Sequence, residues 1–356
     1  MINSFKIKNF KQFNDLFLKH LNLITLIGGK NNTGKTTVLE AFFMFYDSIN
    51  PEATLRHLFS RGIGSIPLNP EFLWSPIFNS YDMDKTIEME VSENDVKQKI
   101  QIRHTRVLKK SVFSLPTTKG AVPIVKTNQQ SLNMESLNFN YFFNDQKEEE
   151  FHLIFNGQQL EMHFEQQKKL TKKVVLIPSD AQRDPLKDAE RFGILDIHGH
   201  SDSITDVLKI IEPNLKSLTT ISQGDQALIY GKIDLPQKIP VTQMGEGTAK
   251  LLTILLAIAT HENGMVLIDE LENGWHYSLF PDILKAIHKM AKQYNCQIIA
   301  TTHSYEVKKS MVKGLSAEDL SDTTYIRLDK EKDSIKPKNY DSAMLVAALD
   351  RGWETR

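Results

Sequence analysis

Apolar and polar positions alternate along the chain in patterns that predict its secondary structure. Residues 21–27 (LNLITLI) form an apolar run that ends at Gly28 and Gly29, which predicts a buried strand. The stretch 35–47 (KTTVLEAFFMFYD) is apolar on most faces and predicts a buried helix. Near the N-terminus, residues 4–7 (SFKI) alternate and predict a further strand.

Strands and helices also alternate in the second half of the chain. Residues 248–260 predict a helix that leads into a strand at 264–268, and residues 277–293 predict a helix that leads into a strand at 296–301. A further apolar strand is predicted at 173–178. This alternation predicts an α/β fold with a mixed or parallel core sheet flanked by helices.

The middle of the chain has a different pattern. Short alternating runs recur between residues 85 and 170, separated by turn-prone residues, and predict an antiparallel β-rich region. Beyond it, residues 202–219 predict a helix that is interrupted near Pro213. Two kinds of sheet are therefore expected in one chain.

Composition excludes several classes of protein. The 356 residues carry 43 basic and 44 acidic side chains, so no excess of positive charge indicates nucleic acid. Cys296 is the single cysteine, which excludes an internal disulfide framework and a multi-thiolate metal site. No apolar run approaches roughly 18 residues and no signal pattern opens the chain, so we expect a cytoplasmic protein without membrane contact.

The segment between the first long strand and helix has the pattern of a phosphate-binding loop. Residues 29–36 read G-K-N-N-T-G-K-T, which is G-x-x-x-x-G-K-T between a strand and a helix. The backbone amides and the helix N-terminus favour phosphate, Lys35 bridges the β- and γ-phosphates, and the Thr36 hydroxyl is a ligand for Mg²⁺. The predicted nucleotide-binding residues are Gly29, Lys30, Asn31, Asn32, Thr33, Gly34, Lys35, Thr36 and Thr37.

Two carboxylates follow a later buried strand. Residues 265–270 read M-V-L-I-D-E, so Asp269 and Glu270 stand at the carboxyl end of that strand, where ligands of α/β sheets bind. Asp269 is predicted to hold Mg²⁺ directly or through water, and Glu270 to orient or deprotonate an attacking water. Taken alone, the pair also fits a solvated loop.

Four motifs in order carry a family resemblance. G-K-N-N-T-G-K-T-T-V-L-E-A at 29–41 resembles the phosphate loop of ABC-type ATPases of the SMC/RecF/OLD group, and M-G-E-G-T-A-K-L-L at 244–252 resembles their signature motif. L-I-D-E-L-E-N-G-W-H at 267–276 is similar to their Walker B motif and D-loop, and T-T-H-S at 301–304 to their switch histidine. The nearest resemblance is to stand-alone OLD-like AAA ATP-binding proteins of bacterial defence systems.

The resemblance implies a P-loop NTPase head of the ABC type with an antiparallel β-rich lobe. It divides a single head into an N-terminal part of the nucleotide-binding lobe at 1–84, the β-rich region at 85–170, the part with signature, Walker B and histidine at 171–305, and a C-terminal extension at 306–356.

The resemblance also implies a head-to-tail dimer with ATP between two copies. Gly245, Glu246, Gly247 and Thr248 would cap the γ-phosphate of the opposite subunit's ATP, and His303 would contact the γ-phosphate within its own subunit. Gln182, in the segment 174–184, fits the place of the family's Q-loop as a contact to Mg²⁺. Gly245 and Glu246 stand where the usual signature has Ser and Gly, so slow, oligomer-dependent hydrolysis is expected.

The function implied is an ATP-driven switch. OLD-type nucleases continue into a metal-dependent nuclease domain, whereas 53 residues follow His303 here, so we expect a regulator of a separate effector protein in antiphage defence. One alternative is a RecF-like nucleic-acid-binding ATPase of repair or recombination; another is a non-catalytic ATP-binding scaffold, because the signature is altered. The basic residues that favour nucleic acid are Arg103, Arg106, Lys109, Lys110, Lys168, Lys169, Lys172 and Lys173.

Overall fold

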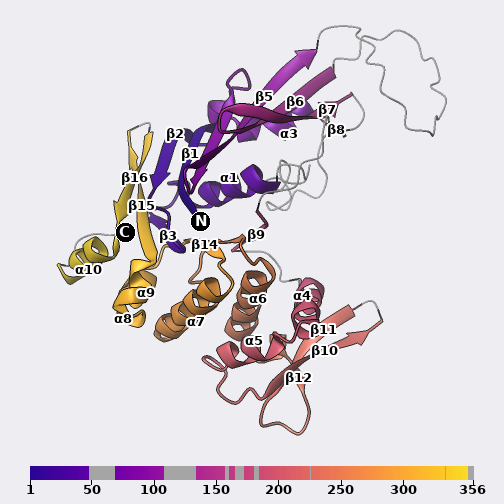
Figure 1. Cartoon of the computed structure of the whole chain (residues 1–356), viewed down its shortest axis with the longest axis vertical. Coiled ribbons are helices and arrows are strands. Elements are labelled where there is room, and N and C mark those ends of the chain that lie inside the picture. The colour runs from indigo at the N-terminus through magenta and orange to yellow at the C-terminus, as the bar shows by residue number, and fades with distance from the viewer. Residues whose placement is uncertain are drawn as a thin grey trace.

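The computed structural model of the chain shows three sheets with helices between and below them (Figure 1). The structure describes residues 1–47, 69–107, 134–156, 160–164, 172–179, 184–224, 226–332 and 334–351. No helix in these ranges is long and apolar enough to cross a membrane.

A six-stranded sheet forms the centre, in the order β16-β15-β3-β14-β13-β9. The five strands from β15 to β9 run parallel to one another, and β16 pairs with β15 antiparallel. The strands are β3 (Ile24–Gly29), β9 (Val174–Ile177), β13 (Met265–Ile268), β14 (Gln297–Thr301), β15 (Thr323–Glu331) and β16 (Ser334–Tyr340). The predicted α/β core with a mixed sheet is confirmed.

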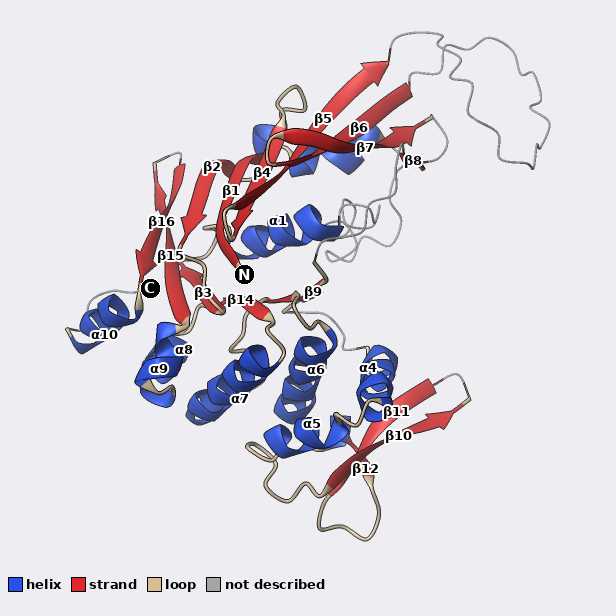
Figure 2. Ribbon diagram, in the orientation of Figure 1, coloured by secondary structure: helices blue, strands red, loops and turns tan. Residues whose placement is uncertain are grey.

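Two hydrophobic cores cover the two faces of this sheet. Along β13, Met265 and Leu267 belong to one core, and Val266 and Ile268 to the other, as the two-residue period of a strand requires. Helix α1 (Lys35–Asp47) lies in the first core, between the central sheet and the larger antiparallel sheet (Figure 2). The helices of the second core or beside it are α4 (Pro185–Ile197), α5 (Ser201–Leu208), α6 (Glu246–Thr260), α7 (Phe280–Gln293), α8 (Tyr305–Gly314), α9 (Ala317–Ser321) and α10 (Ser342–Asp350).

A seven-stranded antiparallel sheet covers α1, in the order β2-β1-β4-β5-β6-β7-β8. It contains the β-rich region expected from residue 85 onward and, in addition, the hairpin β1–β2 from the N-terminus. Its strands are β1 (Ile2–Phe10), β2 (Phe13–Lys19), β4 (Ile87–Glu93), β5 (Val96–Val107), β6 (Met134–Phe143), β7 (Gln146–Phe155) and β8 (Leu160–Phe164). Buried residues alternate with half-buried ones along β4, so one face packs on the core.

The segment after α4 corrects one prediction. Residues 202–219 were expected to be one interrupted helix, but α5 ends at Leu208 and residues from Ser217 form a strand. Pro213 cannot continue a helix, and the residues after it pair with a strand that the local pattern does not reveal. The resulting small sheet comprises β10 (Ser217–Gln223), β11 (Gln226–Lys232) and β12 (Ile239–Pro240).

Short helical turns complete the described chain. They are α3 (Pro70–Trp74), η1 (Ser75–Ile77), η2 (Asn79–Tyr81), η3 (Val241–Gln243) and η4 (Tyr277–Leu279).

Candidate nucleotide-binding site

The phosphate loop joins β3 to α1, as predicted. Gly29 has a φ of +142° and Gly34 a φ of +90°, a backbone region that favours glycine. A Cβ atom on Gly34 would lie 2.1 Å from the side-chain amide of Gln12 and 2.6 Å from the ring of Phe13. The Thr33 hydroxyl closes the loop by donating to the carbonyl of Lys30 at 2.9 Å. Only glycine therefore fits at these turns.

Lys35 is buried at the base of this loop. Its ammonium donates to the carbonyl oxygens of Gly29 at 3.1 Å and Lys30 at 2.9 Å. Burial lowers the pKa of Lys35, and nearby carboxylates, led by that of Asp269, act in the opposite direction. The amino group of Lys35 thus lies inside the loop, bonded to carbonyl oxygens whose place phosphate oxygens can take.

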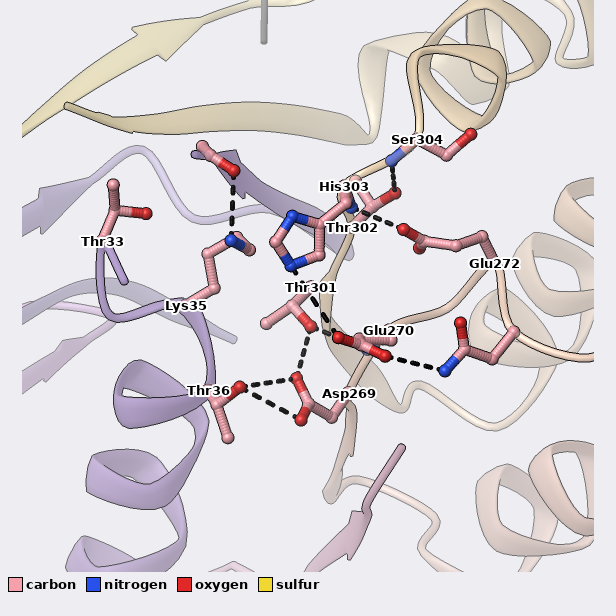
Figure 3. Close-up of polar contacts among 12 residues, drawn as sticks. Thr33, Lys35, Thr36, Asp269, Glu270, Glu272, Thr301, Thr302, His303 and Ser304 are labelled. Carbon is pink, nitrogen blue, oxygen red and sulfur yellow. Dashed lines mark hydrogen bonds and ion pairs between the residues drawn. The ribbon is translucent and has the colours of Figure 1, made fainter. Parts of the chain in front are cut away.

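Asp269 lies at the carboxyl end of β13 and faces the first turn of α1 (Figure 3). The Thr36 hydroxyl lies 3.1 Å from both of its carboxylate oxygens, and the Thr301 hydroxyl donates to one of them at 2.6 Å. Mg²⁺ prefers a carboxylate and hydroxyl oxygens together with phosphate oxygens. Thr36 and Asp269 therefore fit the ion that the phosphate loop implies.

Glu270 adopts a left-handed backbone conformation, with a φ of +47°. Its amide donates to the Thr301 hydroxyl at 2.8 Å, and the Asn273 side-chain amide donates to its carboxylate at 2.7 Å. The other carboxylate oxygen lies 3.8 Å from Nε2 of His303. The structure thus brings the predicted acid and histidine together beside Asp269 (Figure 3).

Glu272 is a further member of the site that the sequence did not reveal. One of its carboxylate oxygens accepts a hydrogen bond of 2.6 Å from the backbone amide of His303. The other is buried without a hydrogen-bond partner among the described residues. Glu272 lies inside the segment 267–276 that resembles the Walker B motif and D-loop, but its role was missed because it depends on a contact with His303, 31 residues later in the chain.

The signature residues lie at the start of α6. This helix begins at Glu246, two residues before the predicted start at Thr248, and Gly245 precedes it with a φ of +126°. Gly247 therefore lies in the first turn, and the N-terminal end of a helix favours an anion. Its carbonyl accepts a hydrogen bond of 2.9 Å from the indole of Trp275, which joins the signature segment to the loop after Glu270 in the same chain.

Other predicted residues lie elsewhere. Gln182 is outside the described residues, so its role as a contact to Mg²⁺ stays a prediction. Among the basic residues, Arg103 and Arg106 are exposed on β5, whereas Lys172 forms an ion pair of 2.8 Å with Glu93. Lys173 is exposed before β9. Lys109, Lys110, Lys168 and Lys169 fall outside the described ranges.

Comparison with known proteins identifies the family. The family described as "AAA domain, putative AbiEii toxin, Type IV TA system" matches residues 24–307. The chain belongs to this family. The matched stretch contains Lys35, the signature segment, Asp269 and His303.

Two individual proteins are similar to the chain in sequence. An ATP/GTP phosphatase of Helicobacter pylori is 25% identical over 359 residues, which cover 96% of this chain and 95% of that protein. An uncharacterized protein of Methanocaldococcus jannaschii is 34% identical over 89 residues, which cover 25% of this chain and 78% of that protein.

A solved structure shows the same fold. The Smc head domain with an extended coiled coil, bound to the C-terminal domain of ScpA and derived from Pyrococcus furiosus, matches with a TM-score of 0.55 and 11% identity. The match covers 98% of each chain. The chain thus belongs to this AAA-domain family and has the fold of an SMC head.

Proposed function

We propose that the chain binds ATP with Mg²⁺ at this site and hydrolyses it slowly, as a switch that closes two copies of the chain around nucleotide. The observation that carries the proposal is the convergence of the Thr36 hydroxyl and the Asp269 carboxylate, 3.1 Å apart, beside the buried Lys35. Residues 233 positions apart supply one oxygen-rich site against a phosphate loop.

The loop supplies the phosphate contacts. The ammonium of Lys35 exchanges its carbonyl partners for phosphate oxygens, and the amides of the loop and of the first turn of α1 donate to the remaining ones. Thr36 and Asp269 would hold Mg²⁺. When bound, the ion neutralises charge on the β- and γ-phosphates.

The second carboxylate carries the hydrolytic step. Glu270 lies next to Asp269 with its side chain held by Asn273, and it orients a water molecule and accepts its proton. His303, whose imidazole lies 3.8 Å from Glu270, contacts the γ-phosphate. The charge that develops on the phosphoryl oxygens is then stabilised from the loop side by Lys35.

A second copy of the chain completes the site. The first turn of α6, with Gly245, Glu246, Gly247 and Thr248, presents amides to the γ-phosphate held by the other copy. Glu246 adds a carboxylate where the family's usual signature has Gly, and Gly245 has no hydroxyl. This composition supports slow turnover that depends on association.

The biological output proposed is control of a separate effector protein in bacterial antiphage defence, by an ATPase similar to those of OLD-type systems. The family description, which names a toxin and a toxin–antitoxin system, supports a role of this kind. The printed name of the Helicobacter pylori relative, ATP/GTP phosphatase, supports nucleotide hydrolysis and makes GTP the competing substrate to test.

Sedimentation velocity tests the switch. The Glu270→Gln protein, which should bind ATP and hydrolyse it about 100-fold more slowly than wild type, is expected to sediment as a dimer with ATP and Mg²⁺ and as a monomer with ADP. Glu270→Gln combined with Lys35→Ala is the matched control and should stay a monomer in both. A Glu270→Gln protein that binds ATP without any change in sedimentation contradicts the proposal.

A second function is favoured by one observation, the exposure of Arg103 and Arg106 on β5. Guanidinium groups at the surface of the antiparallel sheet can contact a phosphate backbone. Under this alternative, single- or double-stranded DNA binds with a steep dependence on salt and stimulates ATP hydrolysis. DNA binding that is lost in Arg103→Ala/Arg106→Ala protein would support it, and no binding at low salt would exclude it.

A further inference from the structure

The backbone of Glu270 is strained, and three neighbours hold it in place. Its φ of +47° costs energy for a residue with a Cβ, so the conformation persists only where the surroundings fix it. Thr301 accepts a hydrogen bond from the amide of Glu270, and Asn273 donates to its carboxylate. Its carbonyl accepts a hydrogen bond of 3.1 Å from the ammonium of Lys250.

Lys250 reaches this turn from the signature helix. It lies in α6, four residues after Glu246, and its ammonium also lies 2.8 Å from the carbonyl of Asn273 and 3.4 Å from that of Leu271. One cation thus gathers the carbonyl groups of the turn that begins at Glu270. Hydrogen bonds from a charged donor are about twice as strong as neutral ones, so Lys250 is well suited to hold a strained turn.

Trp275 adds a second link between the same two segments. Its indole donates to the carbonyl of Gly247 at 2.9 Å, and the ammonium of Lys250 lies 4.6 Å from the centre of its ring. A Cβ atom on Gly247 would lie 2.5 Å from the ring. The first turn of α6 and the turn after Glu270 are therefore in close contact at Gly247 and Trp275.

We infer that Lys250 is a positioning residue: from α6, it holds the backbone of Glu270 and so fixes the position of the Glu270 carboxylate. The inference rests on the proposed function. Because the first turn of α6 would contact the nucleotide held by a second copy, Lys250 connects that contact to Glu270 in its own copy. When the first turn of α6 contacts the nucleotide of the second copy, Lys250 then adjusts the position of Glu270, which acts on the nucleotide bound in its own copy.

The test compares Lys250→Met, which keeps the aliphatic chain and removes the ammonium, with Lys285→Met, an exposed position on α7 away from the site. Lys250→Met is expected to lower kcat about tenfold or more and to leave the Kd for ATP within about twofold of wild type. Lys250→Arg, which keeps charge and donors, should recover part of kcat. Lys285→Met should match wild type in both quantities.

A double-mutant cycle separates positioning from a general loss of structure. If Lys250 acts through Glu270, then Lys250→Met has no further effect on single-turnover hydrolysis in Glu270→Gln protein. Should Lys250→Met be poorly folded, Trp275→Phe, which removes only the indole donor and part of the ring, is expected to lower kcat with the Kd for ATP retained.

The outcomes distinguish the two proposals. A wild-type protein that does not hydrolyse ATP overturns the proposed function. An active wild type overturns the inference instead if Lys250→Met retains its kcat, or if Lys250→Met lowers hydrolysis by the same factor with Glu270 and with Gln at that position.

Discussion

The carboxylate of Glu272 accepts a hydrogen bond of 2.6 Å from the backbone amide of His303, 31 residues later in the chain. This bond ties the turn after β14 to the turn after β13. On the other side of His303, the Ser304 side chain caps α8 by accepting hydrogen bonds from the amides of Glu306 and Val307. The backbone that carries the histidine is therefore fixed at both ends.

Glu272→Ala is expected to release the histidine turn and lower kcat about tenfold, because removal of one positioning hydrogen bond to a charged acceptor costs about 1.5–3 kcal/mol. Glu272→Gln keeps an accepting oxygen and should lose less. Steady-state phosphate release measures both, with the exposed Glu262→Ala as control. Equal rates in Glu272→Ala and Glu262→Ala proteins would show that the bond has no part in turnover.

Lys35→Ala is expected to weaken ATP binding about 10- to 100-fold, because it removes the charged donor at the base of the loop, worth about 1.5–3 kcal/mol. Isothermal titration with ATP and Mg²⁺ measures the Kd. Lys289→Ala, an exposed residue of α7, is the control and should bind as wild type. Unchanged affinity in the Lys35→Ala protein argues against the loop as the nucleotide site.

Gly247→Ala is expected to reduce the free energy of unfolding by about 1–3 kcal/mol, because the added methyl group collides with the Trp275 ring. Gly193 is a matched control, since it also lies in a helix and a Cβ there would meet nothing within 4 Å. Gly193→Ala should stabilise the protein by up to about 1 kcal/mol. Urea unfolding measures both, and equal effects of the two substitutions would refute the tight contact.

The stability of the protein should fall in acid through His261. Its imidazole follows α6 with Nδ1 2.8 Å from the carbonyl of Ala257, and burial lowers the pKa of His261 from 6.5 to about 4. Between these values the unfolded chain binds a proton that the folded chain does not. The free energy of unfolding therefore decreases as pH falls from about 6.5 to 4, by up to about 3 kcal/mol.

Urea unfolding at several pH values checks this dependence. His261→Gln should flatten the decrease, whereas His276→Gln, at an exposed histidine, should leave it unchanged. A His261→Gln protein with the pH profile of wild type would rule out His261 as its source.

Much of the core and of the site could be predicted because their signals are local. The phosphate loop needs glycine at fixed positions. A continuous apolar run of about four to six residues, such as 265–268, is typical of a central strand that is buried on both faces. Lys35, Asp269 and His303 each follow a parallel strand of the central sheet, so their side chains could be predicted to meet at the carboxyl edge of that sheet.

The features that sequence did not predict depend on which segments pair or pack together. Residues 217–223 become a strand because they pair with 226–232, and pairing overrides a weak local preference. Glu272 and Lys250 acquire their roles only when the turn after β13 meets the turn after β14 and the first turns of α6. Both residues lie inside the motif segments 244–252 and 267–276, but those motifs assigned neither residue a role.

The most direct test of the central claim is the release of phosphate from ATP by purified wild-type and Glu270→Gln proteins with Mg²⁺, over a range of protein concentrations. We predict slow turnover in wild type that rises per molecule with concentration, and a loss of about 100-fold in Glu270→Gln with ATP still bound. Wild-type protein that binds ATP without releasing phosphate at any concentration, or Glu270→Gln protein that turns over at the wild-type rate, would contradict it.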